Sequence, residues 1–252
     1  MSRRRRPHGI FITGTDTGVG KTVVACALAS WYRARGLDVG VMKPVATGGR
    51  YLRGPGGGRW VSEDAVCLAA CAEVTDPWPL INPVCFREPL APWTAARRTH
   101  SAVRLDAVLA AFHALAARHD ILIVEGIGGL LVPLSRHQTV AHLATRLGLP
   151  VVLVARPDLG TLNHTLLSLA CIRRLSLRYR GLILNHARPN PRGRWDRLAQ
   201  RTNPPMLRQF TRLVGTVPFQ PLLSSQGRGM DGLPADWVGR HLDHRILMRM
   251  IG

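Results

Sequence analysis

Short apolar runs alternate along the chain with stretches whose apolar residues recur at helical spacing. Each run is typical of a strand buried on both faces, and these runs lie at 9–13, 39–42, 120–124, 150–155, 182–185 and 213–217. The helical stretches lie at 22–35, 62–72, 104–118, 140–147, from 161 onward and at 237–250. Strands that alternate with helices predict a single α/β domain, in which helices cover both faces of a mostly parallel sheet.

Three stretches interrupt this pattern. Residues 51–60 are rich in glycine and arginine, and residues 76–92 are rich in proline, so we expect loops at both places. Residues 187–205 show no clean periodicity. At the N-terminus, residues 1–8 include four consecutive arginines and are expected to form a disordered basic tail, which leaves 9–252 as the folded domain.

The turn after the first predicted strand has the features of a phosphate-binding loop. Glycines allow backbone N–H groups to surround an anion, and the start of the following helix adds partial positive charge. In this setting Lys21 can reach the outer phosphates, and the Thr22 hydroxyl can bind Mg²⁺. The segment is one residue longer than the standard pattern, since five residues separate its first and last glycines. Its members are Gly14, Thr15, Asp16, Thr17, Gly18, Val19, Gly20, Lys21 and Thr22.

The composition singles out a second lysine. The 252 residues carry a net charge of +19, yet only two of the 34 basic residues are lysines, Lys21 and Lys43. So strong a bias indicates a general preference for arginine, with lysine kept where a compact ammonium is needed. Lys43 follows the predicted strand 39–42, at the end where open α/β sheets bind ligands. We therefore predict that arginine cannot replace it without loss of turnover.

Charge and cysteine content exclude several other classes of protein. The positive charge has no accompanying basic-aromatic recognition motif, so we expect no specific nucleic-acid partner. No apolar run reaches membrane-spanning length, and no signal-peptide core follows the N-terminal arginines, so we expect a soluble cytoplasmic protein without a membrane partner. The five cysteines do not form the paired spacing of a zinc site, and we expect buried free thiols.

Glu125 is a candidate metal ligand. It directly follows the apolar run 120–124 and precedes a glycine-rich turn. A buried strand has little other use for a carboxylate, and an acidic residue in this position often completes the Mg²⁺ site of a phosphate-loop enzyme.

Four motifs in order resemble the dethiobiotin synthetase family, whose members are ATP-dependent enzymes of biotin synthesis. The first is the phosphate loop itself, including its length. The others are Lys-Pro-Val-Ala-Thr-Gly at 43–48, Glu-Gly-Ile-Gly-Gly at 125–129 and Leu-Gly-Thr-Leu-Asn-His at 159–164. The resemblance runs from about residue 9 to about residue 218 and is weak at 187–212. It implies a P-loop NTPase-like fold with ATP and Mg²⁺ as cofactors.

The resemblance also implies roles for individual residues. Asp64 would join Thr22 and Glu125 as a metal ligand, although it can equally serve the helix dipole, and Glu63 is its neighbouring competitor. Asn185 would read the adenine edge, although it can equally form a turn. His164 fits a packed histidine better than a catalytic one. The substrate would contact Thr17, Lys43, Thr47, Gly128 and Asn163, the last of these across the interface of a homodimer.

The activity implied is that of a C–N bond-forming cyclo-ligase. It would combine 7,8-diaminononanoate, CO₂ and ATP into a cyclic urea, with ADP and phosphate as the other products. Lys21 and Lys43 would neutralise charge between two anions. Two alternatives stay open: a cobyrinate-type amidating synthetase, for which no glutaminase domain is evident, and a partitioning or positioning ATPase. The second group carries a lysine where this chain has Asp16, and only the net charge favours it.

Overall fold

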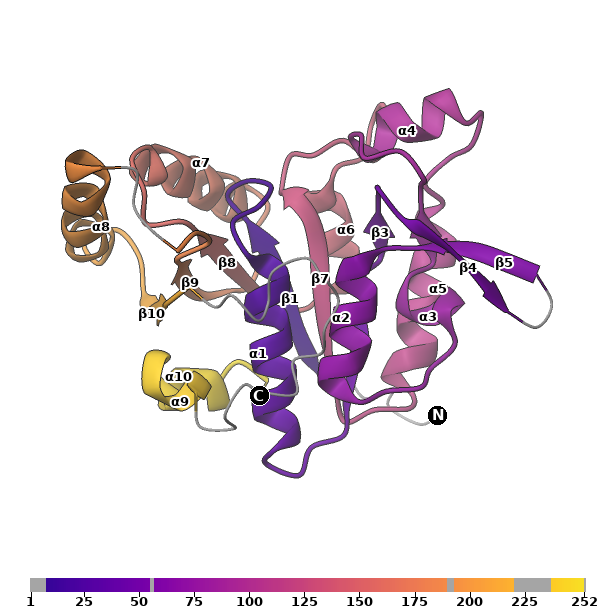
Figure 1. Cartoon of the computed structure of the whole chain (residues 1–252), viewed down its shortest axis with the longest axis horizontal. Coiled ribbons are helices and arrows are strands. Elements are labelled where there is room, and N and C mark those ends of the chain that lie inside the picture. Colours follow the sequence, from indigo (N-terminus) through magenta and orange to yellow (C-terminus); the bar gives the residue numbers. More distant parts are fainter. Residues whose placement is uncertain (1–7, 55–56, 190–192, 220–236, 252) are drawn as a thin grey trace.

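Six parallel strands form the central sheet of the protein (Figure 1). The computed structural model describes residues 8–54, 57–189, 193–219 and 237–251. In sheet order the strands are β10 (Leu213–Val217), β9 (Tyr179–Asn185), β8 (Val151–Ala155), β1 (Gly9–Gly14), β7 (Ile121–Gly129) and β2 (Val39–Met42). This arrangement confirms the predicted α/β class with a mostly parallel sheet.

Successive residues of each central strand face opposite layers of the core. In β1, Ile10 and Ile12 belong to one buried cluster and Phe11 to the other. The same alternation recurs in β7, where Ile123 lies in the first cluster and Leu122 in the second. Because both faces are covered, these strands are apolar at nearly every position, which explains their clear signal in the sequence.

Helices cover both faces of the sheet, as predicted (Figure 1). The first face is covered by α1 (Lys21–Arg33), α2 (Glu63–Ala72), α9 (Trp237–His241) and α10 (His244–Met248). The second is covered by α5 (Leu105–Ala116), α6 (Val140–Leu147) and α7 (Thr161–Arg174), and Leu207 of α8 (Arg194–Leu207) also reaches its core. Two short helices, α3 (Trp78–Ile81) and α4 (Pro92–Arg98), complete the set in the described residues.

Strand order determines where ligands can bind. β1 lies in the middle of the sheet between β8 and β7, and β2 lies at the edge beyond β7. Since all six strands are parallel, their carboxyl ends lie on the same side of the sheet, and the segments that follow β1, β2, β7 and β9 begin there. Open sheets of this kind bind ligands at the carboxyl ends of their strands.

Several stretches expected to be irregular are ordered. Residues 51–54 and 57–60 lie in two paired antiparallel strands, β4 (Arg50–Gly54) and β5 (Gly57–Val61), and Tyr51 packs edge-on against Trp60. The proline-rich stretch contains α3 and β6 (Val84–Cys85), which pairs with β3 (Val45–Ala46). Helix α8 was missed because only three of its residues are buried, Ala199, Asn203 and Leu207, and two prolines lie in its last turns.

The C-terminal helix is divided into two. Asp243 caps the start of α10 by accepting hydrogen bonds from the Arg245 and Ile246 amides, so the helix predicted over 237–250 is interrupted there. Helix α7 begins at Thr161, where the helical stretch was predicted to begin, and Gly160 is its N-cap. The predicted basic tail lies almost wholly outside the described residues. Within those residues, no helix is both long and apolar enough to span a membrane.

A histidine joins two aspartates at the opposite edge of the sheet from the strand ends that carry Lys43 and Glu125. His119 Nδ1 lies 2.8 Å from Asp38 Oδ1, and His119 Nε2 lies 2.8 Å from Asp76 Oδ2. Arg118 also pairs with Asp76, at 3.0 Å. Partial burial opposes the charge on the imidazole, but the two carboxylates outweigh it and raise the pKa of His119. The imidazole therefore ties the loop before α3 to the start of β2 through one contact on each ring nitrogen.

This contact predicts a pH-dependent contribution to stability. A raised pKa in the folded state stabilises the fold fully below the unfolded pKa of about 6.5, and the effect is lost as pH rises through the folded value. We expect His119→Gln to cost about 1–2 kcal/mol at pH 6 and less at pH 9. Urea unfolding at both pH values measures this, with exposed His137→Gln as the control. An equal cost at both pH values contradicts the assignment.

Candidate active site

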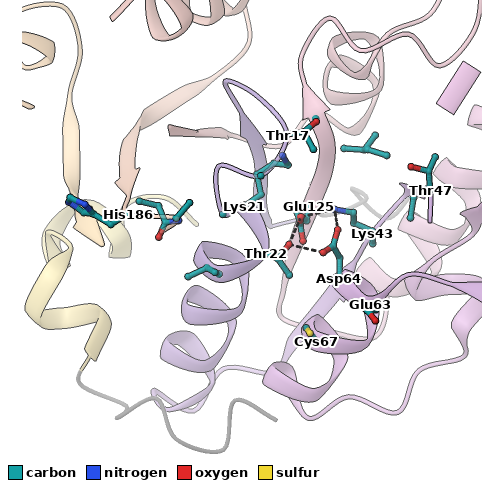
Figure 2. A pocket seen from close by; sticks show the side chains of 18 of the residues that line it. Thr17, Lys21, Thr22, Lys43, Thr47, Glu63, Asp64, Cys67, Glu125 and His186 are labelled. Carbon is teal, nitrogen blue, oxygen red and sulfur yellow. Dashed lines mark hydrogen bonds and ion pairs between the residues drawn. The ribbon is translucent and has the colours of Figure 1, made fainter. Parts of the chain in front are cut away.

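A cavity of about 530 Å³ opens beside α1 at the edge of the sheet where the strands end (Figure 2). Its walls come from the phosphate loop, the end of β2, the start of α2, the end of β7 and the segments after β9 and β10. The lining residues are Thr17, Gly18, Gly20, Lys21, Thr22, Val23, Lys43, Ala46, Thr47, Glu63, Asp64, Cys67, Glu125, Ile127, Gly128, Asn185, His186, Ala187 and Phe219.

The phosphate loop depends on glycine at its end. Gly20 has φ of 89° and caps α1, and a Cβ at this position would lie 1.9 Å from Asn185 Nδ2. The same amide donates a hydrogen bond to the Val19 carbonyl at 3.0 Å. Lys21 folds back over the loop and donates to the Asp16 carbonyl at 3.0 Å. The end of β9 therefore holds the loop in place, which requires a residue without a side chain at position 20.

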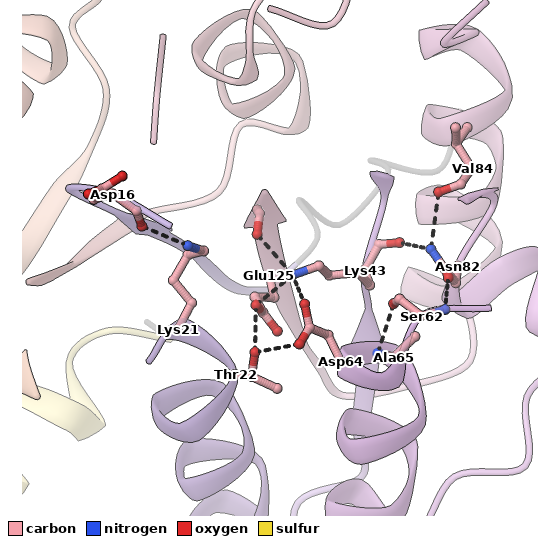
Figure 3. Close-up of polar contacts among 11 residues, drawn as sticks. Asp16, Lys21, Thr22, Lys43, Ser62, Asp64, Ala65, Asn82, Val84 and Glu125 are labelled. Carbon is pink, nitrogen blue, oxygen red and sulfur yellow. Dashed lines mark hydrogen bonds and ion pairs between the residues drawn. The ribbon is translucent and has the colours of Figure 1, made fainter. Parts of the chain in front are cut away.

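The side-chain oxygens of Thr22, Asp64 and Glu125, the three candidate metal ligands, lie together at the start of α1 (Figure 3). Thr22 Oγ1 lies 3.0 Å from Asp64 Oδ1 and 3.0 Å from Glu125 Oε1. Ser62 caps α2 by accepting from the Ala65 amide, which places Asp64 in the first turn facing α1. The neighbouring Glu63 lines the cavity, but its side chain is exposed and, among the described residues, forms no hydrogen bond or ion pair with Thr22, Asp64 or Glu125.

This oxygen cluster fits a hydrated Mg²⁺. The Thr22 hydroxyl oxygen lies within 3.0 Å of an oxygen of each carboxylate, and its single proton can serve only one of them at a time. Glu125 Oε2 is buried and has no hydrogen-bond partner among the described residues. Nucleotide-dependent Mg²⁺ sites usually take only one or two carboxylates and complete the shell with phosphates and water. Within the described part of the chain, no group of three or more His, Cys, Asp or Glu side chains is placed to hold a metal ion.

Lys43 lies in the same group. Its Nζ is 2.6 Å from Glu125 Oε1, 2.7 Å from Asp64 Oδ2 and 3.2 Å from the Gly126 carbonyl (Figure 3). The exposed fraction of its side chain is 3%, and that of Glu125 is 1%. The rare lysine predicted to be functional is therefore a buried partner of both candidate metal ligands.

Burial and charge set the pKa values in opposite directions. For Lys43, burial would lower the pKa, but Glu125 and Asp64 raise it above the usual value, so the ammonium stays charged. Burial raises the pKa of Glu125 despite Lys43, whereas Lys43 and Thr22 outweigh burial and lower the pKa of Asp64. For Lys21, burial and then the nearby Lys43 charge lower the pKa to about 8. The site therefore places two ammonium groups beside two carboxylates in a largely buried setting.

Asn82 is a buried positioning residue that the sequence did not reveal. Its side-chain amide donates to the Lys43 carbonyl at 2.8 Å and to the Val84 carbonyl at 3.2 Å. Its carbonyl oxygen accepts from the Ser62 amide at 3.0 Å. One side chain thus joins the end of β2, which carries Lys43, to the cap of α2, which carries Asp64 (Figure 3).

The remaining predicted residues divide into two groups. Thr17, Thr47 and Gly128 line the cavity together with Lys43. Asn163 is exposed in the first turn of α7 and does not line it. The neighbouring His164 lies with Thr15, Asp16 and Leu167 in a separate hollow of about 440 Å³ on the other side of the loop.

Sequence reasoning also missed three cavity residues. Cys67 is one turn after Asp64 on α2, and burial raises the pKa of its thiol to about 11, so the thiol stays protonated at neutral pH. His186 and Phe219 line the same cavity as Asn185, and burial lowers the pKa of His186. The position of His186 directly after a buried strand was a usable signal, whereas nothing in the sequence marks Phe219.

We expect Asn82→Ala to destabilise the protein by about 1–3 kcal/mol, because the buried Ser62 amide and Lys43 carbonyl lose their partner. The same change should lower activity even at temperatures where the variant stays folded, since Lys43 and Asp64 lose a common support. Thermal unfolding and turnover measure the two effects. Exposed Asn163→Ala is the stability control, and full activity of the Asn82 variant would show that the positioning is unnecessary.

Comparison with known proteins gives a consistent assignment. Residues 8–227 match the family described as AAA domain. The chain is 40% identical over 228 residues to the ATP-dependent dethiobiotin synthetase of Anaeromyxobacter sp. (strain K), covering 90% of this chain and 96% of that one. It is 37% identical to the enzyme of the same name from Thermodesulfovibrio yellowstonii, covering 84% and 88% of the two chains.

Solved structures support the fold. A plasmid partition protein from Borrelia burgdorferi, bound to AMPPNP, has a TM-score of 0.56 at 13% identity and covers 98% of both chains. The septum site-determining protein MinD of Pyrococcus horikoshii, bound to Mg-ADP, has a TM-score of 0.50 at 17% identity and covers 97% of this chain and 94% of its own. At such identities only the fold is shared. By sequence, and in keeping with its site, the chain belongs to the ATP-dependent dethiobiotin synthetase family.

Proposed function

We propose that this protein is an ATP-dependent ligase of biotin biosynthesis, which closes the ureido ring of dethiobiotin from 7,8-diaminononanoate and CO₂. The observation that carries the proposal is the cavity in which Lys21, Lys43, Asp64 and Glu125 meet next to the phosphate loop. Such a site suits the joining of two anions. The other products are ADP and phosphate, and the cytoplasm is the compartment that supplies ATP.

The chain's residues bind the nucleotide at one end of the cavity. Amides of residues 14–22 surround the β-phosphate, and Lys21 exchanges the Asp16 carbonyl for an outer phosphate oxygen. Asn185 Oδ1 is buried without a partner among the described residues, so it can accept from the adenine amino group. Thr22, Asp64 and Glu125 would hold Mg²⁺, which when bound would neutralise negative charge on the nucleotide phosphates.

At the other end, the substrate diamine lies against Thr17, Thr47 and Gly128. One of its amines takes up CO₂ and becomes a carbamate. An oxygen of the carbamate attacks the γ-phosphate, and the second amine then displaces phosphate from the mixed anhydride and closes the ring. Lys43 lies between these two ends and offers a positive charge to both anions. The attacking oxygen is already anionic, so positioning can replace a general base.

A partitioning or positioning ATPase is the second candidate, because two solved neighbours of that kind share the fold. The loop itself argues against it. Asp16 stands where that group carries its extra lysine, and its carboxylate accepts from the Thr17 amide at 2.7 Å and lies 3.6 Å from Arg156. The aspartate thus has its own role inside this loop.

A homodimer completes the proposal. Leu131, Leu159 and Leu167 have exposed fractions of 69%, 83% and 62% around the start of α7. Leu131 and Leu167 line the hollow that borders the phosphate loop. Exposed apolar side chains in such a group favour an interface. A second copy seated here can bring Asn163 and the start of its α7 to the substrate of the first.

The function is tested by ATPase activity with and without 7,8-diaminononanoate and bicarbonate, with mass spectrometry of the product. We expect ADP formation to depend on both substrates and dethiobiotin to accumulate in equal amount. ATP hydrolysis that ignores both substrates, with no product of dethiobiotin mass, refutes the proposal.

The metal assignment predicts a contrast between adjacent residues. Asp64→Asn should reduce turnover by about a hundredfold and raise the Mg²⁺ concentration required, because a metal ligand loses its charge. Glu63→Gln removes the same charge one residue earlier and should stay within about threefold of the parent. Steady-state kinetics over a Mg²⁺ series compares them, and similar losses in both variants would assign the effect to surface charge.

Lys43→Arg should lower turnover by about a hundredfold or more, because a guanidinium keeps the charge but extends into the path of attack. Lys43 is 2% exposed, so the larger group also strains the fold, and thermal unfolding must accompany the kinetics. Nucleotide affinity should stay near that of the parent. Parent-like turnover would show that any cation serves at this position.

Leu167→Glu should shift the protein from dimer to monomer in light scattering and lower turnover, since an exposed apolar position near the loop gains a charge. Leu198→Glu on α8 is the matched control, because Leu198 is also exposed, at 46%. A monomeric parent would contradict the dimer.

A further inference from the structure

The ammonium of Lys43 lies between the two carboxylates assigned to the metal. It contacts Glu125 Oε1 at 2.6 Å, Asp64 Oδ2 at 2.7 Å and the Gly126 carbonyl at 3.2 Å. An ammonium has three N–H donors, and these three acceptors can use all of them. Asp64 and Glu125 therefore have a cation of the chain itself as their partner (Figure 2).

Both charge and burial oppose the binding of a free divalent cation. Lys21 and Lys43 are formally cations and Asp64 and Glu125 formally anions, so their formal charges cancel without a ligand. A divalent cation alone would lie beside the buried Lys43 ammonium, where charge repulsion is strong. A nucleotide changes this balance, because its phosphates bring negative charge for both lysines.

We propose that Lys43 is the resident counter-ion of the metal site and must release at least one carboxylate before a divalent cation binds, so that the metal enters with the nucleotide. In the proposed reaction, on which this inference rests for the metal ligands, the γ-phosphate and the carbamate then become the partners of the freed ammonium. Binding of the metal thereby frees the Lys43 ammonium to contact the substrates.

Mn²⁺ binding to nucleotide-free enzyme tests the inference, with electron paramagnetic resonance counting the free ion. We expect weak binding by the parent and binding at least about tenfold tighter by Lys43→Met, which removes the charge at similar length. Lys43→Gln, a second neutral variant, should show a similar increase in Mn²⁺ affinity over the parent. Lys21→Met is the matched control, since Lys21 contacts the Asp16 carbonyl instead of a carboxylate. The Mn²⁺ affinity of this variant should exceed that of the parent by less than about threefold.

Two further measurements distinguish a counter-ion role of Lys43 from a merely structural role. Adding Asp64→Asn to Lys43→Met should abolish the gain, because the new Mn²⁺ site needs that carboxylate. Mn²⁺ should also raise the melting temperature of Lys43→Met more than that of the parent. Loss of stability without any change in Mn²⁺ affinity would overturn the proposal.

If neither Lys43 variant folds, the parent alone decides. Weak Mn²⁺ binding that strengthens when AMPPNP is added, beyond the affinity of AMPPNP itself for Mn²⁺, supports the inference. Tight Mn²⁺ binding without nucleotide refutes it. None of these measurements uses the diamine or bicarbonate, so a failure of the proposed function and a failure of this inference give different results.

Discussion

The buried ion pair between Lys43 and Glu125 is the interaction on which the site depends. Its geometry follows directly from strand pairing. β2 and β7 are parallel neighbours in which Val41 faces Ile123 and Met42 faces Val124. The next residues along both strands are Lys43 and Glu125, so the register itself brings the two charges together. In a low-dielectric setting neither charge is tolerated without the other.

The surroundings of the pair position the other groups. Asp64 joins it from α2, whose start is capped by Ser62 and tied to β2 through Asn82. Thr22 joins it from α1, directly after the phosphate loop. Elements distant in the chain therefore place four polar side chains within hydrogen-bonding distance. These contacts hold the four side chains together before a ligand arrives.

The contrast between lysine and arginine has a physical basis in this structure. Arginine supplies most of the positive charge of the chain, and several arginines form ion pairs at the surface, such as Arg98 with Glu88. Both lysines are buried at the cavity instead. A compact ammonium fits among closely spaced oxygens where a planar guanidinium does not. The composition of the chain thus reflects the geometry of its site.

The sequence alone determined the fold class, the family and the ends of several strands. β2 and β10 begin and end where the apolar runs do, because a strand buried on both faces must be apolar throughout. The phosphate loop was identifiable because its glycines directly follow such a strand. Lys43 was identifiable because it is one of only two lysines and also directly follows a strand. Asp64 required the family resemblance, since a carboxylate in the first turn of a helix has an ordinary alternative role.

Only the tertiary structure decided which polar groups meet. Asn82 gave no signal, because its three hydrogen bonds join segments that pattern reasoning treats separately. The paired strands β4 and β5 and helix α8 were missed because few of their apolar residues are buried in a regular period. The contact of Lys43 with Glu125 depends on β2 lying beside β7. Apolar periodicity reveals that a strand is buried but carries no information about its neighbour, because every buried strand has the same pattern.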